Sequence, residues 1–174
     1  MNCLLKSFKI LTVFLFLLQS CSDRPSNEFA RSGIAVGVIV DDLEKSLDFY
    51  TKVIGMMKVR EFVVDSVKAR RMGLGNGESF EIKVLKLIDS EDASEWKLMS
   101  FGKKSDTSKQ EFLPQANGFR YVTIFVKNMT PVLERIHRHG VKTLGESPLM
   151  LDETRMFVLI RDLDGNFIEL IGPK

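Results

Sequence analysis

The first part of the chain shows an alternating pattern followed by a helical one. Residues 34–40 alternate between a valine face and a mixed face, which is typical of a strand. Asp42 can cap a helix that Gly55 ends, and apolar side chains recur between them at helical spacing. These side chains are Leu43, Leu47, Tyr50 and Ile54. The pattern therefore predicts a strand followed by an amphipathic helix.

Two or three further strands are predicted after this helix. They cover residues 58–64, 66–74 and 79–88, and the turn Gly75-Asn76-Gly77 separates the last two. Residues 90–118 show no such period and predict a long connection. The first half of the chain therefore reads β-α-β-β-β.

The second half repeats this order. Residues 121–126 alternate again, and Thr130 followed by Pro131 predicts the start of a helix that Gly140 ends. Three more strands are then predicted, over residues 141–144, 155–160 and 166–171.

Two tandem β-α-β-β-β modules, at residues 33–89 and 119–173, predict an α+β domain over residues 33–174. In each module the valine and isoleucine face of the first strand should lie under the helix. The opposite faces should then line a shared cleft. These faces carry Ala35, Gly37, Ile39, Tyr121, Thr123 and Phe125.

The last predicted strand contains one carboxylate among apolar residues. The turn Leu163-Asp164-Gly165-Asn166 leads into it, and Glu169 lies between Phe167 and Ile171 on one face. A carboxylate is costly to bury unless it meets a cation, a metal or hydrogen-bond donors. Glu169 is therefore a candidate cleft residue and, if the protein is an enzyme, a candidate general base. The alternative is an edge strand with Glu169 in water.

The N-terminal segment is predicted to be an export signal over residues 1–20. Lys6 and Lys9 precede the apolar run 10–18, which is well short of the roughly 20 residues that span a bilayer.

Leu18-Gln19-Ser20-Cys21 resembles the lipobox of bacterial lipoproteins. This resemblance implies that Cys21 is lipidated and that the protein is anchored to a membrane of the bacterial cell envelope. Residues 21–32 are polar and suit a linker. The alternative is an ordinary secretory signal with an incidental cysteine.

Composition excludes several classes of function. A hydrophobic content of 44% is enough for a core. Without Lys6 and Lys9 the chain carries 23 basic and 23 acidic residues, so it gives no reason to propose nucleic acid as a partner. Cys3 lies in the predicted signal, so the domain after Cys21 has no thiol for a disulfide, a metal or a nucleophile.

Two motifs resemble the vicinal oxygen chelate superfamily, which includes glyoxalase I, bleomycin resistance proteins and extradiol dioxygenases. The first lies within residues 38–56 (VIVDDLEKS, FY and IGM), and the second is RDLDGNFIEL at 161–170. The resemblance covers about residues 33–173. It implies paired modules that form a curved mixed sheet around a cleft, often completed by a homodimer.

The resemblance also implies where a divalent metal would bind. Metal-using members hold the ion by side chains on the first and fourth strands of each module. Carried over, these positions are Ala35 and Tyr121 on the first strands, Glu169 on the last strand, and Glu81 or, in a shifted register, Lys83 on the remaining one. Ala35 has no donor atom and neutral Tyr121 is a poor ligand, so Glu81 and Glu169 are the metal candidates left.

We therefore expect a small-molecule-binding cleft that has no complete metal site and needs no cofactor. The first alternative is a divalent-metal-dependent lyase, isomerase or dioxygenase with a diverged ligand set. The second is an accessory domain that binds another envelope protein through its sheet face.

Other side chains complete the expected cleft. The ligand-binding candidates are Glu81, Tyr121, Thr123 and Phe167, with Arg71, Arg120 and Arg155 as counter-charges. Trp96, Met99 and Phe101 should form either an apolar lid or a small satellite core. His137 and His139 should interact with the negative end of their helix.

Overall fold

The computed structural model describes residues 28–104 and 110–174. The predicted signal segment and Cys21 lie outside the described residues. Residues 31–174 form one compact unit. Within the described ranges no helix is long and apolar enough to cross a membrane.

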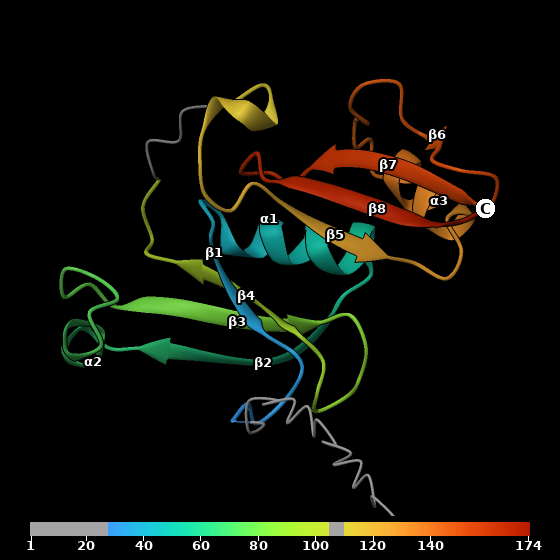
Figure 1. The fold of residues 1–174 in the computed structure, drawn as a ribbon. Helices are drawn as coiled ribbons and strands as arrows, with labels where there is room; N and C mark the ends of the chain where they lie inside the picture. Colours follow the sequence, from blue (N-terminus) through green and yellow to red (C-terminus); the bar gives the residue numbers. More distant parts are fainter. Residues whose placement is uncertain (1–27, 105–109) are drawn as a thin grey trace, which may run out of the picture. The chain divides into compact units, whose positions relative to one another are not determined.

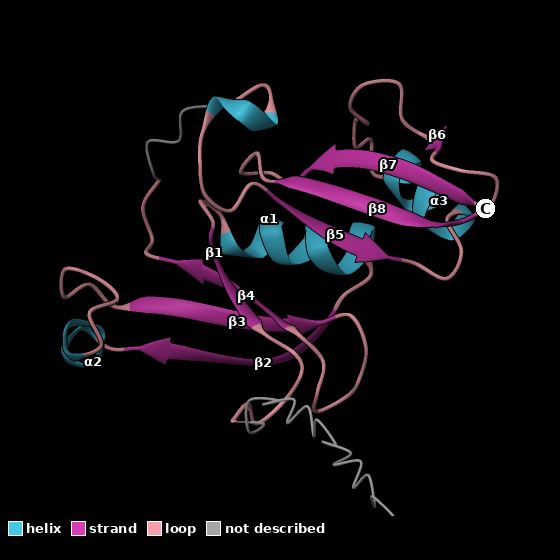
Figure 2. Cartoon of the chain, viewed as in Figure 1, coloured by secondary structure: helices cyan, strands magenta, loops and turns pink. Residues whose placement is uncertain are grey.

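The compact unit contains two four-stranded sheets. Figures 1 and 2 show these sheets together with a few short helices. Sheet A and its helices consist of β1 (Ala35–Ile39), α1 (Leu43–Asp48), η1 (Phe49–Ile54), β2 (Met57–Val64), α2 (Ser66–Arg71), β3 (Phe80–Lys86) and β4 (Glu95–Ser100). Sheet B and its helices consist of η2 (Leu113–Gln115), β5 (Tyr121–Phe125), α3 (Thr130–Arg138), β6 (Leu149–Met150), β7 (Arg155–Arg161) and β8 (Phe167–Pro173).

The two sheets have the same topology. Their strand orders are β1-β4-β3-β2 and β5-β8-β7-β6. In each sheet the first and fourth strands pair in parallel, while the other pairs are antiparallel. The α+β fold of two similar modules is therefore confirmed, and β4 is the counterpart of β8. The strands form two sheets, each of them mixed.

The predicted strand 66–74 is wrong, because residues 66–71 form helix α2. The Asp65 side chain caps this helix by accepting a hydrogen bond from the Lys68 N–H at 2.9 Å. Ala69 is fully buried against Val64, Phe80 and neighbouring residues. Local capping and this one buried contact outweigh the weak alternation of the segment.

The long connection predicted for residues 90–118 is also wrong in part, because it contains strand β4. Trp96 and Leu98 point to the main core while Glu95 and Lys97 point away from it, which is the alternation of an ordinary strand.

The predicted strand 141–144 is reduced to a single bridge between Thr143 and Ile160. The short strand β6 follows at Leu149–Met150.

The first predicted helix begins and ends where the sequence indicates. Asp42 accepts a hydrogen bond from the Lys45 N–H at 3.1 Å, and Gly55 ends the helix with a φ of 93°. Its second half is the π-helix η1, whose last carbonyls are bound by the second module. Arg135 on α3 donates to the carbonyl oxygens of Val53 and Ile54 at 2.8 and 3.0 Å.

Both modules contribute to one hydrophobic core. As predicted, the valine and isoleucine faces of β1 and β5 point to this core. Helices α1 and η1 of the first module and α3 of the second pack into it. Its fully buried side chains include Val40, Tyr50, Leu85, Leu98, Met129, Val158, Ile160, Ile168 and Leu170.

A buried hydrogen bond joins η1 to the turn before β8. The Tyr50 hydroxyl donates to Asp162 Oδ2 at 2.7 Å, and Asp162 also accepts hydrogen bonds from the backbone and side chain of Asn166 at 2.7 and 2.9 Å. Burial raises the pKa of Tyr50, and the negative charge of Asp162 raises it further. Tyr50 is therefore protonated at neutral pH and donates this hydrogen bond.

Tyr50→Phe is expected to lower the free energy of unfolding by about 2 kcal/mol, because the buried Asp162 carboxylate loses a donor. The loss is measured by urea unfolding. Tyr121→Phe is the matched control, since Tyr121 is the second of the two tyrosines and is exposed. Equal unfolding midpoints for both variants would contradict the assigned role of Tyr50.

Candidate functional site

Each sheet has one face that points to the core and one, here called the open face, that points away from it. Directly paired residues on neighbouring strands share a face, so strand register identifies the members of each open face. The open face of sheet B carries Tyr121, Thr123, Phe125, Phe157, Leu159, Arg161, Phe167, Glu169 and Ile171.

Glu169 lies at the centre of this face. Its strand, β8, is flanked by β5 and β7, so the alternative of an edge strand is wrong. The register places Glu169 between Thr123 on β5 and Leu159 on β7. The Thr123 hydroxyl donates a hydrogen bond to Glu169 Oε2, and the residue is half-buried. The structure thus brings the predicted pair Glu169 and Thr123 together.

The aromatic residues of this face differ in exposure. Phe167 is buried, and the Arg161 guanidinium lies over its ring at 4.3 Å from the centroid. Tyr121 and Phe125 are 56% and 74% exposed. Two large aromatic side chains on the same strand are therefore available to a ligand.

A pocket of about 520 Å³ adjoins this face through Arg161. Arg161 also donates a hydrogen bond to the carbonyl oxygen of Glu111 at 2.5 Å, which holds the connection beside the pocket. The other lining residues are Phe112, Val141, Lys142, Leu144 and Gly145, and none of them was a predicted site residue.

Glu81 and Lys83 do not share a face with the cleft candidates. Both point to the core side of β3, where the Lys83 ammonium pairs with Glu44 of α1 and lies 3.9 Å from Glu81. Burial alone would lower the pKa of Lys83, but Glu44 and Glu81 outweigh it and raise the pKa. Glu81 therefore belongs to a structural ion-pair cluster rather than to the open face.

The predicted arginines have other local roles. Arg71 ends α2 in the first module and is exposed. Arg155 lies on β7 and pairs with Asp152 at 2.6 Å, while Arg120 donates to the carbonyl oxygen of Leu113 at 3.0 Å. The structure thus does not bring them to Glu169.

The other candidate residues outside sheet B contribute to packing or lie at a helix end. Met99 and Phe101 pack against the smaller cluster under α2, which corresponds to the predicted satellite core, and Trp96 packs against the main core. His137 and His139 are exposed at the end of α3, as expected for a helix-end role.

The true counterpart of Glu169 is Lys97, which the sequence reading missed. Ala35 pairs with Glu95 as Tyr121 pairs with Phe167, and Gly37 pairs with Lys97 as Thr123 pairs with Glu169. The proposed equivalence of Glu81 or Lys83 with Glu169 is therefore wrong. Strand β4 lies in the segment predicted as a connection, although EWKLMS alternates as a strand does.

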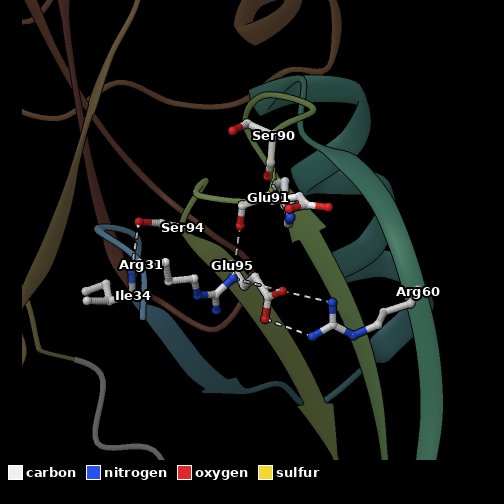
Figure 3. Close-up of polar contacts among 8 residues, drawn as sticks. Arg31, Ile34, Arg60, Ser90, Glu91, Ser94 and Glu95 are labelled. Atoms are coloured by element: carbon white, nitrogen blue, oxygen red, sulfur yellow. Dashed lines mark hydrogen bonds and ion pairs between the residues drawn. The ribbon is translucent and has the colours of Figure 1, made fainter. Parts of the chain in front are cut away.

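The open face of sheet A holds a buried carboxylate bound by two arginines (Figure 3). Glu95 is only 4% exposed, and Arg60 binds both of its oxygens at 2.8 and 2.9 Å. Arg31 lies 3.5 Å away on the same carboxylate. These hydrogen bonds and charges lower the pKa of Glu95 to about 2 against the opposing effect of burial.

The model of the Glyoxalase/Bleomycin resistance protein/Dioxygenase superfamily matches residues 34–170. The chain belongs to this superfamily. Sequence relatives include a lactoylglutathione lyase of Neisseria meningitidis serogroup A, which is 27% identical over 135 residues, 78% of this chain and 86% of the relative.

Solved structures of glyoxalase family proteins share this fold. A glyoxalase family protein from Bacillus cereus has a TM-score of 0.69 at 21% identity, with 86% of this chain and 97% of the other covered. TnmS3, an antibiotic-binding protein from a Streptomyces species, has a TM-score of 0.53 at 18% identity over 84% of this chain and 99% of its own. At these identities the likeness shows the fold alone.

The resemblance to metal-using members of the superfamily implies four ligand positions, on the first and fourth strands of each module. They carry Ala35, Lys97, Tyr121 and Glu169. An alanine has no donor atom, a lysine ammonium has no lone pair to donate, and a neutral phenol is a weak ligand. A single carboxylate remains, so this donor set does not fit the divalent site of a glyoxalase.

Glu95→Gln is expected to remove a pH-dependent part of the stability. A carboxylate with a lowered pKa stabilises the fold above its ordinary value of 4.5, and this contribution is lost as the pH falls from 4.5 through 2. For Glu95 the contribution is roughly 3 kcal/mol. Urea unfolding at pH 7 and at several pH values below 4.5 should show a weaker protein with a flatter profile.

Glu134→Gln, which changes an exposed glutamate on α3, is the control and should keep the steep profile. A Glu95→Gln profile parallel to that of the parent would contradict the role given to this carboxylate.

Proposed function

We propose that this protein is an envelope-anchored member of the glyoxalase superfamily that binds a small molecule on the open face of sheet B, without a complete metal site. The observation that carries the proposal is the placement of Glu169. It lies half-buried at the centre of a central strand, with neutral Thr123 as its hydrogen-bond partner among the described residues.

The surroundings of Glu169 favour a ligand with a polar group and an apolar body. A carboxylate flanked by Phe167 and Ile171 gains most from a ligand that supplies hydrogen-bond donors or a positive charge. Tyr121 and Phe125 offer exposed aromatic surface on the neighbouring strand. The fold shared with an antibiotic-binding protein is compatible with binding as an activity in its own right.

The second candidate is a divalent-metal-dependent lyase. It is supported by the sequence relatives that are named lactoylglutathione lyases. In that case Glu169 is the candidate general base and the metal ligand that the chain retains. An assay for lactoylglutathione lyase activity, with and without added divalent ions, separates the two candidates, and tight stoichiometric metal in the purified protein would favour the lyase.

A homodimer stays a prediction of the family resemblance. It would cover apolar side chains that are exposed on the open faces, such as Ile39 and Phe125. Light scattering of the purified protein, with a mass equal to one chain, would rule it out.

Glu169→Gln is expected to weaken ligand binding while leaving the fold intact, because the amide keeps the shape and removes the charge. A thermal-shift screen on the parent identifies ligands, and each ligand is then titrated against the variant by calorimetry. Ligands with a cationic or donor group should lose about tenfold or more in affinity. Glu153→Gln, at an exposed glutamate in the loop before β7, is the control. Unchanged affinity for every ligand of the parent would remove Glu169 from the site.

The envelope location is tested at the predicted lipidation residue. Since Cys21 would be the anchor, Cys21→Ser should yield an exported protein that no longer fractionates with membranes. The parent should take up radiolabelled palmitate and the variant should not. A parent that stays unlabelled and soluble would exclude the lipid anchor.

A further inference from the structure

Lys97 lies at the centre of the open face of sheet A. The strand registers place it in one row with Gly37 on β1, Val84 on β3 and Arg60 on β2. Lys97 is half-buried, and its neighbour Gly37 has no side chain to cover it. The Met99 side chain lies over Gly37, because a Cβ placed there would be 3.0 Å from Met99 Sδ. The Lys97 side chain thus has mostly apolar neighbours at the centre of the face.

The other charged groups of this face already have partners. Arg60 and Arg31 are held by Glu95, and the Lys86 ammonium donates to the carbonyl oxygen of Ser90 at 2.8 Å. Among the described residues, the Lys97 ammonium group has no hydrogen bond or ion pair. Glu95, two residues before it, is the one carboxylate in the central rows of this face, and both of its oxygens are occupied by arginine. The face therefore carries an excess of positive charge.

Lys97 is the counterpart of Glu169, so its positive charge lies at a position related to the metal ligands of the superfamily. A divalent ion in a metal-using glyoxalase would supply positive charge to an acidic or oxygen-rich ligand. In this chain one of the positions that would hold the ion carries a cation itself. A lysine ammonium can pair directly with an anionic group and needs no metal to do so.

We propose that Lys97 binds the acidic group of a small ligand, a carboxylate or a phosphate, whose apolar part lies over Gly37, Ile39 and Met99. The proposal rests on the proposed function in one respect, that the open sheet faces bind small molecules. It extends that function by naming the chemical class of the ligand and a second binding residue, on the other module from Glu169. It also gives the positive charge of the site to the protein rather than to a metal.

Calorimetric titrations of the purified protein with hexanoate, hexyl phosphate and the neutral hexanamide test this assignment. The three probes share a similar apolar chain and differ in the head group. At low ionic strength the parent should bind at least one of the acids about tenfold or more tightly than the amide. The acid that binds more tightly shows whether Lys97 prefers a carboxylate or a phosphate. Treatment with EDTA should leave this preference unchanged.

Lys97→Met should abolish the preference for the acid, and Lys97→Arg should keep at least part of it. Lys127→Met, at an exposed lysine after β5, should behave like the parent. Thermal unfolding without probe shows that each variant is folded. Equal binding of acid and amide, no binding of either acid, an unaltered preference in Lys97→Met, or loss of binding with EDTA would each overturn the assignment. Ligands that depend on Glu169 but ignore Lys97 would leave the proposed function standing and remove only this inference.

Discussion

The buried hydrogen bond between Tyr50 and Asp162 connects the parts of this protein that the rest of the structure depends on. Tyr50 lies in η1 of the first module, and Asp162 begins the turn that leads into β8 of the second. The same turn is held to the start of α1, since Asp164 accepts hydrogen bonds from the Asp41 N–H at 2.9 Å and the Ser46 hydroxyl at 3.3 Å. Because this turn sets where β8 starts, the contact also sets the position of Glu169 on the sheet.

In this arrangement the core faces of both sheets are buried, while the open faces are only partly covered. Burial of the valine, isoleucine and leucine faces around η1 and α3 supplies most of the stabilisation. The open faces also contribute, because Phe80, Ile82 and Val84 of sheet A are buried in the smaller cluster and Phe167 of sheet B is buried as well. The chain carries alanine, tyrosine and lysine at three of the four positions related to metal ligands, and its fold is shared with glyoxalase family proteins.

The two open faces differ in charge at the same position of the repeat. Lys97 and Glu169 occupy equivalent places, and each lies among apolar or aromatic neighbours. The charged groups around them are neutralised locally, as Arg60 neutralises Glu95 and Asp152 neutralises Arg155. The two sheets thus present equivalent but oppositely charged centres, on which the two proposed binding residues rest.

Much of the fold could be predicted from local patterns, because alternation and helix caps are properties of neighbouring residues. The β1 faces, the Asp42 cap, the Gly55 stop and the turn before Glu169 all depend on short-range chemistry, and the sequence determined them together with the repeat and the superfamily. The rest depended on tertiary contacts in addition to local patterns. Residues 66–71 became a helix because Asp65 caps them and Ala69 finds a buried place, and residues 95–100 became a strand because β1 and β3 pair with them on both sides. Only this pairing shows that Glu81 points to the core and that Lys97 matches Glu169, because strand register depends on residues far apart in the chain.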